Sequence, residues 1–238
     1  MTRRAPKPTL PPEQLAVAWQ SVSLLLDYPD ETLLERLPLL RAASHELPEG
    51  TGGPIRAFVD HLAVAELHEV QARYVETFDS RRRCNLFLTY FAYGDTRKRG
   101  MALLRFKQTY LRSGCVLDDS SERGGELPDH LCVVLEYAAT VDRELGRRLL
   151  LDHRAGLELL RLSLHDASSP WAALLDAVTS TLPPLRGDER DAVRRLAAEG
   201  PPEEEVGLSP YALPEPGAAG VPAGPDLLPM PSFPGARP

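Results

Sequence analysis

Apolar residues recur at helical spacing along most of the chain, and no stretch shows the alternating pattern, bounded by hairpin turns, that is typical of strands. The first helix is predicted to begin at Pro12, where a missing N–H costs nothing, and to end before Pro29. One face of this helix is apolar throughout, being formed by Leu15, Ala18, Trp19, Val22, Leu25 and Leu26. The pattern predicts an all-α fold.

A second helix is expected after Asp30, a suitable N-cap, although Pro38 should shorten or kink it. The glycines and proline of residues 50–54 predict a break, followed by a third helix from about Ile55 to Phe78. Residues 85–93 form an almost continuous apolar run that suits either a buried helix or a strand. We favour a helix there because no neighbouring segment has the pattern of a pairing strand.

Asp95 is expected to cap the next helix, which should end at Gly114 and bury a face formed by Met101, Leu104, Gln108 and Leu111. Pro128 should open another helix, whose apolar stripe is Leu131, Val134, Leu135, Ala138, Val141 and Leu145. Three more helices fit residues 152–166, residues 169–181 with Ser169 as cap, and residues 188–199.

Prolines mark the end of the part of the chain that can fold. Eleven of the twenty-three prolines lie between Pro201 and Pro238, where the apolar residues are isolated and share no period. Residues 206–238 are therefore predicted to be a flexible tail, and residues 1–11 a flexible N-terminus. The helical domain is expected to span residues 12–200.

The composition is that of a packed globular protein. With 238 residues, 43% of them hydrophobic and 26% charged, wholesale disorder is excluded. No run of eighteen apolar residues occurs, and residues 1–11 lack the apolar segment of a secretory signal. We therefore expect a cytoplasmic protein without direct membrane insertion.

The formal net charge of -7 is unevenly distributed. Residues 81–112 contain nine Lys or Arg and a single acid, Asp95, so that the rest of the chain is strongly acidic. Cations interleaved with Phe and Tyr would suit nucleic acid, but the acidic remainder would repel a polyanion. A solvated cationic helix face is the better interpretation, and we expect cationic partners and no nucleic acid.

Catalytic signals are absent from the sequence, which contains no common catalytic or nucleotide-binding motif. His61 and His68 lack further ligands at matching positions, so no metal site is expected. Cys84, Cys115 and Cys132 fit neither a disulfide framework nor a CxxC pair and are expected to be buried free thiols. We predict no catalytic residue and no cofactor.

An acid–histidine pair stands in the segment Glu126-Leu127-Pro128-Asp129-His130-Leu131. Asp129 is expected in the first turn of a helix, where a carboxylate suits the positive helix end, and His130 can hydrogen-bond to another helix. The pair allows two interpretations. It is either structural capping or the acid and base of a small-molecule enzyme, which would need a polar pocket around it.

Seven short segments between residues 74 and 136 follow one another in a recognisable order: YVETFD (74–79), RRC (82–84), LFLTY (86–90), GDTR (94–97), RGMALLRFK (99–107), ELPDHL (126–131) and LE (135–136). Together they resemble the core of the respiratory nitrate reductase assembly chaperones, the delta subunits or NarJ-type proteins. The resemblance implies an all-helical, single-domain fold of the molybdoenzyme maturation chaperone type.

The resemblance also implies a function without catalysis. Members of the family bind the N-terminal segment of the catalytic (alpha) subunit and keep the apo-enzyme receptive until the molybdenum cofactor and the iron–sulfur centre are inserted. The alternative within the same class is a chaperone for a different molybdoenzyme, such as a sulfoxide or amine-oxide reductase.

In the wider group, a Tyr/Phe motif and an acid–His pair line the peptide groove, and these positions correspond to Tyr74, Phe78, Asp129 and His130. Tyr74 and Phe78 are four residues apart and should form an apolar wall, while Asp129 should meet basic side chains of the peptide. The complete predicted peptide-binding set is Tyr74, Phe78, Tyr90, Glu126, Asp129, His130 and Glu136.

Overall fold

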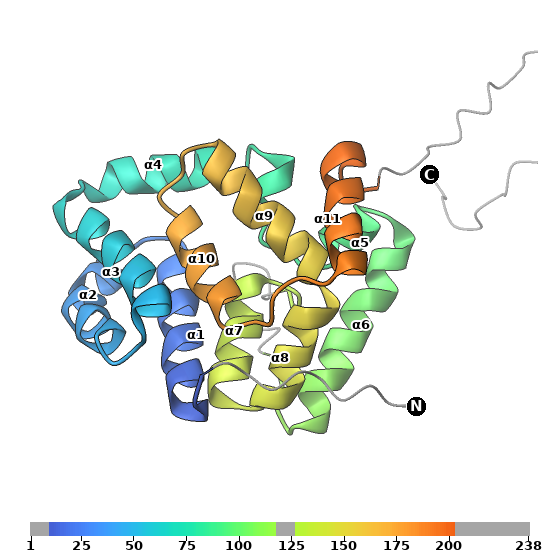
Figure 1. Ribbon diagram of the computed structural model, residues 1–238, viewed down its shortest axis with the longest axis horizontal. Helices are drawn as coiled ribbons and strands as arrows, with labels where there is room; N and C mark the ends of the chain where they lie inside the picture. The colour runs from blue at the N-terminus through green and yellow to red at the C-terminus, as the bar shows by residue number, and fades with distance from the viewer. Residues whose placement is uncertain (1–9, 118–126, 203–238) are drawn as a thin grey trace, which may run out of the picture. The chain divides into compact units, whose positions relative to one another are not determined.

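The computed structural model describes residues 10–117 and 127–202, and the regular structure of these residues is helical (Figure 1). The all-α prediction is confirmed. The predicted tail and residues 1–9 lie outside the described residues. The helices are α1 (Pro12–Leu26), α2 (Glu31–Ser44), α3 (Glu49–Val64), α4 (Leu67–Phe78), α5 (Tyr90–Tyr93), α6 (Arg97–Arg112), α7 (Leu131–Thr140), α8 (Arg143–Asp152), α9 (Arg154–Asp166), α10 (Ala172–Ser180) and α11 (Gly187–Glu199), with a 3-10 turn, η1 (Arg82–Cys84).

Helix α1 is the centre of the core. It packs against α2, α7 and α10, and its predicted apolar stripe is completely buried. Two polar contacts fix it in place, since the Trp19 indole donates to Thr181 Oγ1 at 3.0 Å and Ser23 Oγ donates to the Cys132 carbonyl at 2.8 Å. These two polar side chains of an apolar helix thus form their hydrogen bonds with distant parts of the chain.

The predicted break at residues 50–54 is wrong, because α3 begins at Glu49 and includes all of them. Gly52 serves a packing purpose there: a Cβ at this position would lie 2.2 Å from the Ser44 carbonyl oxygen at the end of α2. The glycine therefore allows two helices to approach closely instead of ending one. The actual interruption lies at residues 65–66 and divides the predicted third helix into α3 and α4.

The predicted helix over residues 85–93 is also wrong in its first half. Phe87 forms an isolated antiparallel bridge with His130, and only Tyr90–Tyr93 is helical. Leu88 N–H donates to the Asp129 carbonyl at 3.0 Å, and Leu131 N–H donates to the Leu86 carbonyl at 2.9 Å. The pairing partner is thus a short extended piece before α7, which has no strand pattern of its own.

Helix α6 presents the opposite face to the one predicted. Met101, Leu104 and Leu111 are 61%, 50% and 57% exposed, whereas Phe106 and Tyr110 are buried. The aromatic side chains bury more area than the aliphatic ones and so decide which face turns inward. The cap prediction also fails, because Thr96 occupies the N-cap position and Asp95 forms an ion pair with Arg99.

The helix predicted to begin at Pro128 begins instead at Leu131 and ends at Thr140. Asp142 then caps α8 by accepting a hydrogen bond from Leu145 N–H at 2.9 Å. Asp129 is consequently not in the first turn of a helix, and its carboxylate has other partners.

The last three predicted helices correspond to α9, α10 and α11, although Trp171 and not Ser169 stands at the N-cap position of α10. Cys84, Cys115 and Cys132 are free thiols, of which Cys115 is only partly buried. Within residues 10–117 and 127–202, no helix has both the length and the apolar character needed to cross a membrane.

Tight packing between α7 and α8 can be tested at Gly146. A Cβ there would lie 2.4 Å from the Ala138 Cβ, so Gly146→Ala should lower the free energy of unfolding by about 1–3 kcal/mol through overpacking. Gly100→Ala is the matched control: Gly100 is also helical, but its Cβ would meet no atom within 4 Å, so we expect a gain of about 0.5–1 kcal/mol. Urea unfolding measures both, and equal effects would contradict this packing.

Candidate functional site

Four aromatic rings from different parts of the chain meet beside α4. Tyr74 and Phe78 lie one helical turn apart, with ring centroids separated by 4.7 Å. The Trp171 ring contacts both edge-on, at 5.7 Å from Tyr74 and 5.5 Å from Phe78, and the Tyr28 ring meets Tyr74 at 5.4 Å. We call Tyr28, Tyr74, Phe78 and Trp171 the aromatic cluster.

Most of the aromatic cluster is inaccessible to a ligand in this structure. Tyr74, Phe78 and Trp171 are 8%, 7% and 2% exposed, whereas Tyr28 is 48% exposed. Tyr28 follows the end of α1 and covers one side of Tyr74. It is therefore the side chain through which the cluster reaches the surface.

Two exposed carboxylates lie near the Tyr74 hydroxyl, which donates to the Leu26 carbonyl at 3.2 Å. Burial raises the pKa of the Tyr74 phenol, and Cys132, Asp27 and Asp79 raise it further because they disfavour a second negative charge. Asp27 follows α1 and Asp79 follows α4. We call Asp27 and Asp79 the acidic rim, because both are exposed and both act electrostatically on the Tyr74 hydroxyl.

Asp129 is completely buried and ties three segments together. Its Oδ2 accepts from Thr89 N–H at 3.1 Å and from the Thr89 hydroxyl, and it lies 3.8 Å from Arg99 Nη2. Arg99 also donates to Thr89 Oγ1 at 3.3 Å and to Asp95 at 2.8 Å. We call Asp129, Thr89 and Arg99 the Asp129 junction, which joins the start of α6 to the turn before α5 and to the turn before α7.

His130 lies beside this junction as a neutral ring. Its imidazole meets the edge of Phe87 at 5.1 Å, and the Arg99 guanidinium lies over the same phenyl ring at 5.3 Å. Burial lowers the pKa of His130 from its ordinary 6.5, and the negative charges of Asp27 and Asp129 oppose this shift only in part. The negative charge of Asp27 therefore acts on both His130 and Tyr74.

The remaining predicted residues lie apart from these two groups. Tyr90 is buried, and its hydroxyl accepts from Arg82 Nε at 2.9 Å. Glu136 is on the exposed face of α7, and Glu126 lies outside the described residues.

Neither sequence-based interpretation of the acid–His pair agrees with this geometry. The Asp129 carboxylate binds Thr89 and not the first turn of α7, so it is no helix cap. Among the described residues, no hydrogen bond joins the Asp129 carboxylate to the His130 ring, as an acid–base pair would require. The described residues also contain no group of three His, Cys, Asp or Glu side chains that could hold a metal ion.

The sequence-based prediction missed six residues of this region: Asp27, Tyr28, Asp79, Thr89, Arg99 and Trp171. Only Arg99 carried a usable signal, because it lies four residues after Asp95 and so could pair with it on one helix face. Trp171 could not have been assigned to the cluster, since α10 meets α4 only through the tertiary fold.

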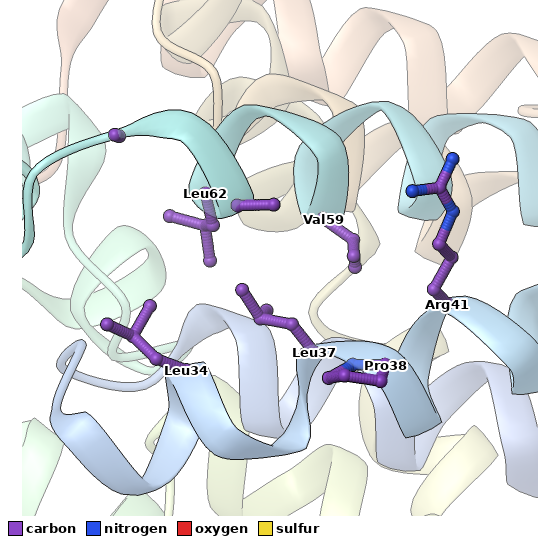
Figure 2. Close-up of a pocket in the computed structure, with 8 residues that line it drawn as sticks. Leu34, Leu37, Pro38, Arg41, Val59 and Leu62 are labelled. Atoms are coloured by element: carbon purple, nitrogen blue, oxygen red, sulfur yellow. The ribbon is translucent and has the colours of Figure 1, made fainter.

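A separate apolar cavity of about 400 Å³ lies between α2 and α3. Figure 2 shows Leu34 and Leu37 of α2 facing Leu62 and Val59 of α3, with Arg41 at one end. Arg41 is the charged residue of the lining and pairs with Asp60 at 2.9 Å. None of the predicted peptide-binding residues lines this cavity, and its cationic end suits a basic peptide less well than the acidic rim.

Comparisons with known proteins point to one family. Residues 44–177 match the family model described as nitrate reductase delta subunit. The nitrate reductase-like protein NarX of Mycobacterium tuberculosis is 41% identical over 169 residues, which make up 69% of this chain and 24% of NarX. The chain thus spans about a quarter of that relative's length.

Two further proteins are similar over most of their own length. The probable nitrate reductase molybdenum cofactor assembly chaperone NarJ of Bacillus subtilis is 30% identical over 167 residues, covering 70% of this chain and 88% of that protein. The crystal structure of a putative redox enzyme maturation protein from Archaeoglobus fulgidus aligns with a TM-score of 0.49 and 22% identity, over 76% of this chain and 93% of that one.

The Asp129 junction predicts unequal effects for the two acids that neighbour Arg99. Asp129→Ala removes a buried carboxylate, leaves the Thr89 donors without their acceptor and leaves Arg99 without its buried negative neighbour, so the free energy of unfolding should fall by about 3 kcal/mol or more. Asp95→Ala removes the exposed partner of the same guanidinium and should cost less than about 1 kcal/mol. Denaturant titration compares them, and a reversed order would show that the junction is not the stabilising element.

His130 predicts a pH dependence of stability. Because burial lowers its folded-state pKa below 6.5, the unfolded chain binds a proton at this site before the folded chain does. The neutral ring is therefore compatible with the fold above about pH 6.5, and its contribution to stability is lost as the pH falls below that value. Relative to His130→Gln, the wild-type chain should lose unfolding free energy between about pH 7.5 and 5.5. A difference that stays constant with pH would contradict the assignment.

Proposed function

Because the chain belongs to the nitrate reductase delta subunit family, we propose that it is an assembly chaperone for a nitrate reductase. In this role it binds the N-terminal segment of the catalytic subunit in the cytoplasm. It holds the apo-enzyme in a state that can accept the molybdenum cofactor and the iron–sulfur centre. The chain itself needs no catalytic residue and no bound cofactor for this task.

The observation that carries the site is the position of the acidic rim beside a half-exposed tyrosine. Asp27 and Asp79 lie near Tyr74, and Tyr28 offers an apolar ring with a hydroxyl at the surface. A basic amphipathic peptide helix can place an apolar side chain against Tyr28 and its Lys or Arg side chains toward the two carboxylates. The buried rings of Tyr74 and Phe78 form the inner side of this surface.

Asp129 and His130 take part in the proposed site in different ways. Asp129 is buried and already close to Arg99, so it acts as a positioning residue for the segment that carries His130. His130 is partly buried and neutral, and Asp27 acts on it as it acts on Tyr74. The peptide therefore contacts His130 and the acidic rim, while the Asp129 junction fixes their geometry.

The affinity should be moderate and should depend on few side chains. Ordering a flexible peptide costs about 2–5 kcal/mol of the interaction energy, so only well-buried anchors give a net gain. Charge complementarity adds mainly to the rate of association and to specificity. A complex of this kind forms on an immature subunit and dissociates once the segment is taken up by the folded enzyme.

Charge reversal at the acidic rim tests this site without disturbing the core, because both acids are exposed. We expect Asp27→Lys/Asp79→Lys to weaken binding of a synthetic N-terminal peptide of the catalytic subunit by about tenfold or more, and Tyr28→Ala to weaken it about threefold or more. Isothermal titration calorimetry measures the dissociation constants.

Asp188→Lys/Glu199→Lys, which changes two exposed acids of α11, is the matched control because it alters the net charge by the same amount, and it should bind as the wild type does. If the rim variant bound the peptide with unchanged affinity, the site would lie elsewhere on the chain. If the wild-type chain did not bind the peptide at all, the proposed function itself would be wrong.

A further inference from the structure

The outward face of α6 is an apolar seam with the spacing of a coiled coil. Met101, Leu104, Gln108 and Leu111 are all exposed and follow one another at steps of three, four and three residues. These are the a and d positions of a heptad, the ones that pack between two paired helices. We call these four residues the α6 seam.

Cations flank the seam along its length. Lys98, Arg105 and Arg112 are exposed and seven residues apart, so they form one row beside the seam, and Lys107 lies on the other side. Helix α6 contains no Asp or Glu. Among the described residues, no ion pair involves Lys98, Arg105 or Arg112. The row formed by Lys98, Arg105 and Arg112 is therefore positive and available to an outside partner.

The buried face of α6 holds the seam in a fixed orientation. The Tyr110 hydroxyl donates to the Pro128 carbonyl at 2.6 Å, and the Phe106 ring lies 5.1 Å from the His153 ring. In Figure 1, α6 lies along the side of the described helices opposite α2 and α3, with its outer face uncovered by another helix. A partner would meet a helix that is already formed, which lowers the entropy cost of binding.

We propose that the α6 seam binds an acidic amphipathic helix of a partner protein. Apolar residues of that helix fill the spaces between Met101, Leu104 and Leu111, and its Glu or Asp side chains pair with the flanking cations. The seam takes a ligand of opposite charge to the one proposed for the acidic rim, so it is a second binding surface and does not depend on the first.

The charges argue against two other occupants of the seam. In a second copy of the chain, α6 would bring Arg105, Arg112 and Lys107 against the same cations in either orientation, which destabilises the pair. A membrane of anionic lipid would attract the cations, but the rest of the chain is acidic and would be repelled from it. A single acidic helix satisfies both the heptad spacing and the charge.

The test uses the full-length chain and two synthetic helical peptides of three heptads, with Leu at a and d. One peptide carries Glu at e and g, and the other carries Lys there. Fluorescence anisotropy should show binding of the Glu peptide and at least about tenfold weaker binding of the Lys peptide. Arg105→Glu/Arg112→Glu should reverse this preference, because the two flanking charges change sign.

Leu104→Ser/Leu111→Ser should weaken binding of the Glu peptide about tenfold or more, since it removes apolar area from the seam. Leu39→Ser is the matched control, because Leu39 is a leucine of α2 that is 70% exposed and lies outside the seam. All five leucines and arginines changed in these tests are exposed, so thermal unfolding followed by circular dichroism should stay close to that of the wild type.

Several results would overturn the proposal. If the two peptides bound equally, or if the Glu peptide did not bind, the flanking cations would not select an acidic helix and the proposal would be wrong. If the wild-type chain sediments as a dimer and Leu104→Ser/Leu111→Ser sediments as a monomer, the seam binds a second copy of the chain. Binding to phosphatidylglycerol vesicles that the same variant abolishes, without binding of the Glu peptide, would assign it to a membrane.

Discussion

The buried carboxylate of Asp129 is the interaction on which the geometry of the candidate site depends. It accepts both Thr89 donors and lies near Arg99, so it fixes the extended residues before α5, the start of α6 and the approach to α7. A buried charge is stable only when its partners are held in place. Here one partner, Arg99, lies in α6, and the other, Thr89, lies in a segment with little regular structure. The carboxylate thus orders a region in which helix packing alone would leave the chain poorly defined.

Negative and positive side chains lie on different parts of the molecule. The exposed carboxylates of the acidic rim follow the ends of α1 and α4, while the exposed cations Lys98, Arg105 and Arg112 belong to α6, which lies in another part of the described helices (Figure 1). A net charge of -7 conceals this arrangement. Two ligands of opposite sign can therefore be accommodated without competing for the same surface.

Much of the fold was predictable because local and tertiary preferences agree in α1, where a continuous apolar stripe is delimited by Pro12 and Pro29. They disagree at Gly52. Glycine locally disfavours a helix, but this helical position requires it because the Ser44 carbonyl leaves no room for a side chain. Residues 86–88 pair with a segment far away in the chain, and no local pattern contains that information. In α6 both faces are apolar, and the larger volume of Phe106 and Tyr110 determined which one is buried.

The same reasoning separates what could be predicted at the site from what could not. The contact between Tyr74 and Phe78 follows from helical spacing, whereas the roles of Trp171, Tyr28 and Asp27 depend on how α10 and α1 meet α4. The partners of α1 also come late in the chain, since Ser23 bonds to a residue 109 positions later and Trp19 to one 162 positions later. During synthesis on the ribosome, the helix at the centre of the core is consequently made before its partners and covered last, which leaves the nascent chain itself exposed to aggregation until α10 has emerged.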